Sequence, residues 1–191
     1  MARSFDPDRV AALETAGWKA YAARSWPRFL LTLTVVNGEE FHIPFPRSLL
    51  ASWYITRAGV AWAPVNHDVS VVRTFMEKYY SLVRTYSGWE FDAARAAEYE
   101  MWYWDVHRRL STLDGDKPEF VNALTALHAE VFGICHDAAQ ESARWRVEAN
   151  NRYDRILFGT SPSTADTWAA VQFALQTCYR TVAAGLNGSS V

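Results

Sequence analysis

The sequence has few cysteines, few lysines and no long apolar run, and each shortage excludes a class of protein. Its two cysteines, Cys135 and Cys178, are far apart and have neither metal-binding nor redox spacing, which is typical of a reduced, cytoplasmic protein with core thiols. The longest uncharged run inside the predicted fold, residues 167–179, has thirteen residues and is too short to cross a bilayer. No apolar stretch follows Arg3, so we expect no secretory signal.

The sequence also has no large excess of positive or negative charge. The 19 basic residues nearly cancel the 21 acidic ones, and the only lysines are Lys19, Lys78 and Lys117. Without an excess of basic charge, or a basic patch interleaved with exposed aromatic residues, we expect the protein to bind neither nucleic acid nor an anionic membrane. No glycine-rich loop follows a predicted strand, which argues against a phosphate-binding loop.

Apolar and aromatic residues are abundant. Of the 191 residues, 50% are hydrophobic and 15% are aromatic, with nine tryptophans, which is enough for one compact core and argues against disorder. Prolines, glycines and capping residues divide the chain into short segments with helical periodicity and no linker between them. We therefore predict an all-α fold, a single-domain bundle of about seven helices that spans residues 1–191.

Several helix ends are marked by residues with a known capping role. Aspartates that precede apolar-periodic segments predict helix starts at Asp6, Asp68 and Asp92. Residues 163–166 resemble a capping box and predict the start of the last helix, which we expect to stop at Gly185.

Residues 31–43 fit two structures. β-Branched residues and the dipeptide Asn37-Gly38 favour a small β-hairpin. However, a lone hairpin in a helical chain has no other strand to pair with, and Trp26-Pro27 resembles the start of a helix. We expect a helix here, with the hairpin as the alternative.

The first predicted helix carries a glutamate within its apolar stripe. At 100° per residue, the neighbours that lie within about 60° of Glu14 are Val10, Ala11, Gly17, Trp18 and Tyr21. Burying an unpaired carboxylate costs several kcal/mol, so Glu14 requires a cation, a metal ion or a proton.

The predicted fifth helix carries a glutamate and a histidine on one apolar stripe. Glu100 and His107 share this face with Trp104 and several alanines. Seven residues separate the pair, which is two turns and about 10.5 Å of rise. Side chains that lean toward each other from these positions can reach one shared ion.

Polar residues interrupt the apolar faces of other helices as well. If residues 31–43 are helical, Glu39 and His42 form an E-x-x-H pair one turn apart. His128 falls on the apolar face of the sixth helix, and Arg146 on that of the seventh.

These residues fit three interpretations. The first is a buried network in which Glu14 or Glu100 pairs with Arg146 or Arg108, and His107 bonds to a carboxylate. The second is an iron or manganese site, because helical bundles hold such ions with carboxylates and imidazoles from facing helices. The third is a pocket for an apolar or aromatic ligand, with the same groups as its polar anchors.

The set Glu14, Glu39-x-x-His42 and Glu100-x6-His107 is similar to the ligand inventory of ferritin-like and haem-oxygenase-like di-iron proteins. Ferritin-like chains supply a second E-x-x-H, which this sequence lacks, and the last predicted helix offers no histidine and only Asp166. The similarity is therefore one of chemistry and covers isolated residues.

The metal interpretation leads to our main functional hypothesis, a soluble, cytoplasmic oxidoreductase that acts on a small apolar or aromatic substrate. Its non-haem iron or manganese would be held by Glu14, Glu39, His42, Glu100 and His107, with His128 in reserve. Glu14, Glu100 and His107 would be catalytic, because carboxylates beside a metal-bound oxygen species accept protons. Trp18, Tyr21, Trp104 and Arg146 would surround the cofactor. The alternative is a non-catalytic interaction, scaffold or apolar-ligand-binding protein, which could be a homo-oligomer whose surplus aromatic residues bury an interface.

Overall fold

A computed structural model describes residues 4–113 and 115–188, which form helices and turns without any strand. The eight helices are α1 (Pro7–Ala22), α2 (Trp26–Phe41), α3 (Arg47–Trp62), α4 (Val69–Ser87), α5 (Ala93–Leu110), α6 (Pro118–Phe132), α7 (His136–Leu157) and α8 (Ala165–Gly188). The predicted all-α bundle is confirmed.

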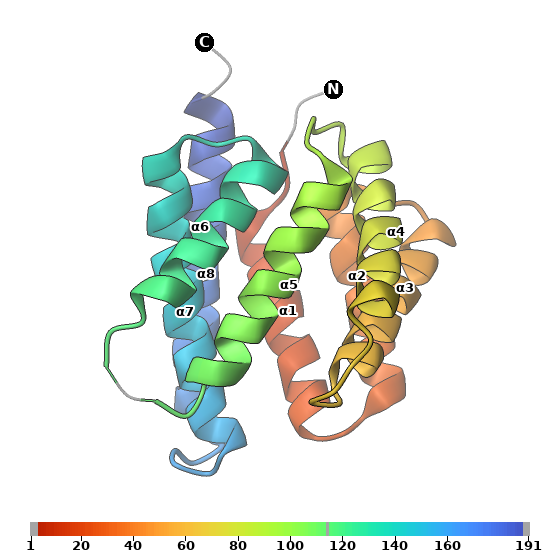
Figure 1. The fold of residues 1–191 in the computed structure, drawn as a ribbon. Coiled ribbons are helices and arrows are strands. Elements are labelled where there is room, and N and C mark those ends of the chain that lie inside the picture. The colour runs from red at the N-terminus through yellow and green to blue at the C-terminus, as the bar shows by residue number, and fades with distance from the viewer. Residues whose placement is uncertain (1–3, 114, 189–191) are drawn as a thin grey trace.

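The helices form a closed ring. Each helix packs against the next one in the chain, and α8 returns to pack against α1. Successive helices run in alternating directions, so their ends gather at two opposite ends of the bundle (Figure 1). Because every helix has two neighbours and an inward face, polar residues on the inward faces are brought together even when they are far apart in the sequence.

The aspartate caps are confirmed. The Asp6 carboxylate accepts hydrogen bonds from the backbone N–H groups of Asp8 and Arg9 at 3.0 and 3.1 Å. Asp68 and Asp92 cap α4 and α5 in the same way. These bonds satisfy N–H groups that have no partner within the helix, which is why the aspartates locate the helix starts.

Residues 26–41 form a helix, so the hairpin alternative for residues 31–43 is wrong. Asn37, which favours a turn, lies inside α2 and is 2% exposed. Its side-chain amide donates to the Leu33 carbonyl at 2.9 Å and to the Ser52 hydroxyl at 3.0 Å. These bonds satisfy the amide within the bundle and remove its reason to form a turn. The helix ends at His42, whose φ of +57° is left-handed.

Three smaller expectations need correction. The last helix is capped by Thr164, whose hydroxyl and backbone N–H exchange hydrogen bonds with those of Thr167, so the capping box lies one residue later than predicted. This helix also continues past Gly185, where the Cβ of Ile134 lies close to the glycine and no left-handed turn occurs. Cys178 is buried as expected, whereas Cys135 is exposed.

The apolar core is divided among all eight helices. Its largest fully buried side chains include Trp89, Phe120 and Met76. Within the described ranges, no helix combines the length and the apolar character that crossing a membrane requires.

Candidate ligand-binding cavity

The ring of helices surrounds a cavity of about 640 Å³, to which all eight helices contribute side chains. Tyr21, Leu157 and Phe158 line one end of it and are all exposed to solvent. They lie where α1 and α7 end, at the lower end of the bundle in Figure 1. The cavity therefore opens to solvent at this end.

Aromatic side chains make up much of the cavity wall. Trp18, Tyr21 and Trp104, which the sequence placed around a cofactor, all line it. Trp104 packs edge-on against Trp62 at a ring separation of 5.4 Å, and Trp18 packs against Tyr153 at 4.9 Å. Such contacts give the cavity a rigid wall with many aromatic faces.

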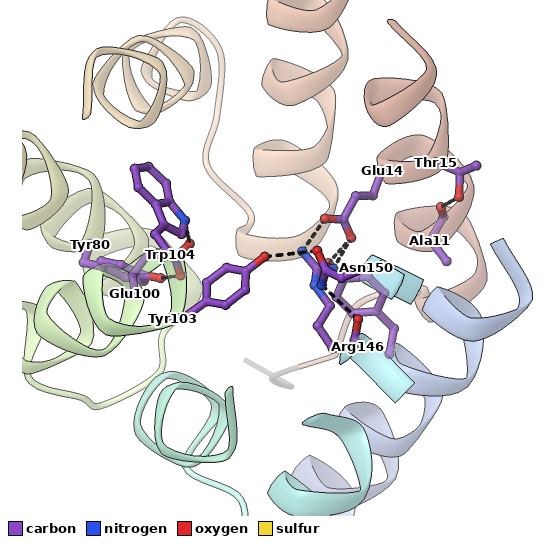
Figure 2. Close-up of polar contacts among 10 residues, drawn as sticks. Ala11, Glu14, Thr15, Tyr80, Glu100, Tyr103, Trp104, Arg146 and Asn150 are labelled. Atoms are coloured by element: carbon purple, nitrogen blue, oxygen red, sulfur yellow. Dashed lines mark hydrogen bonds and ion pairs between the residues drawn. The ribbon is translucent and has the colours of Figure 1, made fainter. Parts of the chain in front are cut away.

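The first polar group in the wall is an ion pair between α1 and α7. The Arg146 guanidinium donates two hydrogen bonds to the Glu14 carboxylate, both at 2.5 Å (Figure 2). The Tyr179 hydroxyl on α8 donates to the same carboxylate at 2.7 Å. Burial, the largest single effect, lowers the pKa of Arg146, but the Glu14 carboxylate acting together with the hydroxyls of Tyr179 and Tyr103 outweighs it, so the pKa of Arg146 is raised. Arg146 is therefore the cation that Glu14 requires.

The second polar group surrounds Glu100 on α5. Its carboxylate accepts hydrogen bonds from the Tyr80 hydroxyl and from the indole N–H of Trp104, each at 2.8 Å. In Figure 2 this group and the Glu14–Arg146 pair lie on opposite sides of Tyr103, whose hydroxyl donates to Asn150 at 3.4 Å. Burial raises the pKa of Glu100, although both donors oppose this shift. No arginine or lysine forms an ion pair with Glu100 in the described part of the chain.

The third carboxyl group belongs to Glu40 on α2, which the sequence analysis missed. Glu40 is 5% exposed and lines the cavity. Among residues 4–113 and 115–188, no group forms a hydrogen bond or an ion pair with its carboxyl. Burial, and then the negative charge of Glu14, raise the pKa of Glu40 well above its usual value.

The sequence held a signal for Glu40. At 100° per residue, Glu40 falls within about 60° of Leu33, Val36 and Asn37 on α2, and all of these line the cavity. Glu39, one position earlier, points about 100° away from this face. The E-x-x-H spacing selected Glu39 and His42 as candidates, whereas the helical periodicity indicates that Glu40 is the inward-facing glutamate.

Glu39 and His42 do not join the predicted ligand set. Glu39 forms an ion pair with Arg9 at 2.8 Å, and His42 Nε2 lies 3.0 Å from the Ser4 carbonyl oxygen on the exposed surface. Neither residue lines the cavity. In the ranges that the structure describes, no three His, Cys, Asp or Glu side chains are grouped so that they could hold a metal ion. The five-residue ligand set is therefore not assembled.

His107 and His128 have protein partners. His107 Nε2 lies 2.9 Å from the Asp154 carboxylate, and its ring stacks on Phe120 at 5.1 Å. His128 Nδ1 lies 2.7 Å from the Ser142 hydroxyl. Burial lowers the pKa of His128 to about 3, so its ring is neutral near pH 7.

The predicted network is confirmed in its main parts. Glu14 pairs with Arg146, and His107 lies against a carboxylate, Asp154. Arg108 has a different role from the predicted one. Its guanidinium donates to the Trp62 carbonyl and lies 3.3 Å from the centre of the Trp62 ring. Arg108 and Trp62 together form part of the cavity wall.

A comparison of the chain with protein-family models found no match, and neither did searches of curated proteins and of solved structures.

Proposed function

We propose that this protein binds a small apolar or aromatic molecule within its central cavity. The observation that carries the proposal is the ring of eight helices around a cavity of about 640 Å³ with an aromatic wall and one open end. Ligand pockets typically measure about 300–1,000 Å³ and combine an apolar lining with a few polar anchors. The Glu14, Glu40 and Glu100 carboxyl groups fit the role of such anchors.

The packing of the rest of the molecule supports this proposal. Protein interiors are normally close-packed, with few voids larger than a water molecule. Elsewhere in the bundle, side chains such as Val10, Val72 and Phe120 are fully buried. A large cavity beside a well-packed core costs stability, and a bound ligand would offset that cost.

The metal-dependent oxidation that the sequence suggested is less well supported than ligand binding. Of its five ligands, Glu14, Glu100 and His107 line the cavity. Each of them already interacts with protein groups: Arg146 for Glu14, Tyr80 and Trp104 for Glu100, Asp154 for His107. A metal ion would have to displace these partners.

A neutral aromatic probe tests the proposal. We expect naphthylmethanol to bind the wild type with micromolar to millimolar affinity in calorimetry, and to raise the melting temperature as its concentration rises. Leu33 lines the cavity, so Leu33→Trp should narrow it and weaken binding by about tenfold. Leu31→Trp is the matched control on the same helix, because Leu31 is 65% exposed, and it should leave the affinity unchanged.

Two results would overturn the proposal. The first is the absence of saturable binding by the wild type, and the second is an equal loss of affinity in both tryptophan variants. Incubation with iron(II) or manganese(II), followed by desalting and metal analysis, tests the alternative. Stoichiometric metal that is lost in Glu100→Gln would favour metal-dependent oxidation over ligand binding.

A further inference from the structure

The cavity lining holds more carboxyl groups than arginines, and one of the carboxyls, Asp154, already contacts His107. Glu14, Glu40 and Glu100 line the cavity, and Arg146 is the only arginine that forms an ion pair with any of them in the described residues. Both terminal nitrogens of Arg146 are bonded to Glu14. Arg108 is bound to the carbonyl and ring of Trp62. The charge of Glu14 is therefore neutralised, whereas Glu40 and Glu100 lack a counter-ion.

Glu40 differs from the other two carboxyls because no described residue forms a hydrogen bond or an ion pair with it. Glu100 accepts two hydrogen bonds from Tyr80 and Trp104, whereas the Glu40 carboxyl accepts none from the described chain, although it is 95% buried. The Glu40 oxygens are not among the fully enclosed side-chain atoms that lack a hydrogen-bond partner, so they reach the open space of the cavity, where a ligand can bind them. Whether ionised or neutral, the Glu40 carboxyl has no hydrogen-bond partner among residues 4–113 and 115–188, so we look for its partner in a ligand.

The aromatic wall narrows the choice of ligand charge. The faces of aromatic rings carry negative potential and attract cations. Tyr79 and Tyr80 line the cavity near Glu40. Burial raises the pKa of both tyrosines; the charge of Glu40 is the next cause for Tyr79 and a smaller one for Tyr80, after that of Glu100. A cation beside Glu40 would be attracted by both the carboxylate and the rings. An anion would meet two carboxyls that form no ion pair with a described residue, and both arginines of the lining, Arg146 and Arg108, are already engaged.

We propose that the ligand carries a protonated amine, whose ammonium group binds the Glu40 carboxyl while its apolar body packs against the aromatic wall. This inference rests on the proposed function, because it names the chemical class of the molecule that occupies the same cavity. Binding involves no covalent step. If Glu40 is protonated before binding, its proton leaves to solvent as the ammonium group binds. The net charge of the cavity with its ligand then equals the net charge of the cavity before binding.

This exchange predicts a pH dependence. The groups that face Glu40 are Glu14 on α1, Tyr79 and Tyr80 on α4, Glu100 on α5, Arg146 on α7, and Cys178 and Tyr179 on α8. From α3, only the non-titrating Ile55, Trp62 and adjacent Ala63 line the cavity. Because Glu40 is buried next to other carboxyls, it holds its proton to a higher pH than an exposed glutamate does. The affinity for an amine should therefore rise with pH, by up to tenfold per unit, until Glu40 is ionised in the free protein.

Three probes of nearly equal shape test the inference: naphthylmethylamine, which is cationic, naphthylmethanol, which is neutral, and naphthoate, which is anionic. For the wild type we expect the amine to bind about tenfold or more tightly than the alcohol, and naphthoate most weakly. Glu40→Gln should bring amine binding down to the level of the alcohol, so that the preference for the cation is lost. Glu39→Gln is the matched control, since Glu39 lies outside the cavity in a surface ion pair with Arg9, and it should retain the preference for the amine.

Proton release gives a second readout that does not depend on the variant. Calorimetry of amine binding in two buffers with different ionisation enthalpies should detect the release of a proton below the pKa of Glu40, and alcohol binding should release none. If Glu40→Gln does not fold, this measurement on the wild type decides the question.

The outcomes distinguish the inference from the proposed function. If none of the three probes binds, both fail. If the alcohol binds and the amine binds no better, or if Glu40→Gln keeps the preference for the amine, ligand binding stands and the role of Glu40 is overturned.

Discussion

Glu14 and Arg146 are separated by 132 residues in the sequence, yet their side chains form two hydrogen bonds of 2.5 Å. The pair joins α1 to α7 across the ring, and the Tyr179 hydroxyl links α8 to the same carboxylate. Both charged side chains are largely buried, with 13% and 16% of their surface exposed. A charge in this setting depends on its partner, which makes the pair a sensitive point of the fold.

We expect Glu14→Gln to destabilise the protein by about 3–5 kcal/mol, because it leaves the charge of Arg146 buried without a counter-ion. Urea unfolding measures the change. Asp8→Asn is the control: it breaks the ion pair between Asp8 and Arg180, whose side chains are both about half exposed, and should cost about 0–1 kcal/mol. Similar losses in the two variants would contradict the importance of the buried pair.

Replacing Glu40 by glutamine should change how stability depends on pH. The raised pKa of Glu40 means that the folded protein keeps a proton that the unfolded chain loses near the usual value of 4.5. In the wild type, this group therefore reduces the free energy of unfolding as pH rises above 4.5, by up to about 1.4 kcal/mol per unit. Glu40→Gln lacks this effect, so its stability relative to the wild type should increase with pH. Parallel stability curves would contradict the prediction.

His128 should produce the opposite pH dependence. Its folded pKa of about 3 lies below the usual value of 6.5, so the unfolded chain takes up a proton first as pH falls. The wild type should lose up to about 1.4 kcal/mol per pH unit from this group between about pH 6 and pH 4. In His128→Gln, this contribution to the loss of stability between neutral pH and pH 4 should be absent, and chemical unfolding of both proteins across this range measures the difference. The exposed His136 provides a control, since His136→Gln should follow the wild type.

The carboxylate of Asp154 should matter because it is 3% exposed and lies against His107. Asp154→Asn weakens this contact and leaves a buried amide imperfectly paired, so we expect a loss of about 1–3 kcal/mol in thermal or urea unfolding. Asp137 has a fully exposed side chain, and Asp137→Asn should stay within about 0.5 kcal/mol of the wild type. An unchanged stability in Asp154→Asn would show that the contact with His107 contributes little.

Gly185 lies at a close approach between α8 and the segment that precedes α7. A Cβ atom there would lie 2.9 Å from Cγ2 of Ile134 and 3.3 Å from Cβ of Ala138. Overpacking of this kind typically costs about 1–3 kcal/mol, which thermal unfolding of Gly185→Ala would detect. Gly38→Ala, whose Cβ has its closest neighbour at 3.6 Å, should be neutral or stabilising. The same loss in both variants would refute this explanation.

Much of the fold was predictable because helix signals are local. Asp6, Asp68 and Asp92 cap helices through hydrogen bonds to residues two or three positions away. The segment around Asn37 was ambiguous because its structure depends on contacts that are distant in the sequence. Its turn-forming tendency is overcome by hydrogen bonds to Ser52 and Tyr79, which belong to other helices. The cytoplasmic location and the association of identical chains stay predictions from composition.

The sequence by itself determined most of the helical segments, though not residues 31–43, and that Glu14, Glu100, His107 and Arg146 would interrupt apolar faces. Periodicity and capping depend on neighbouring residues, so these properties could be read without a structure. Only the tertiary structure decided that Arg146, rather than a metal ion, satisfies Glu14, and that Glu40 faces the cavity while Glu39 pairs with Arg9. Partners are chosen by which helix faces meet when the ring closes, and that choice joins residues more than a hundred positions apart.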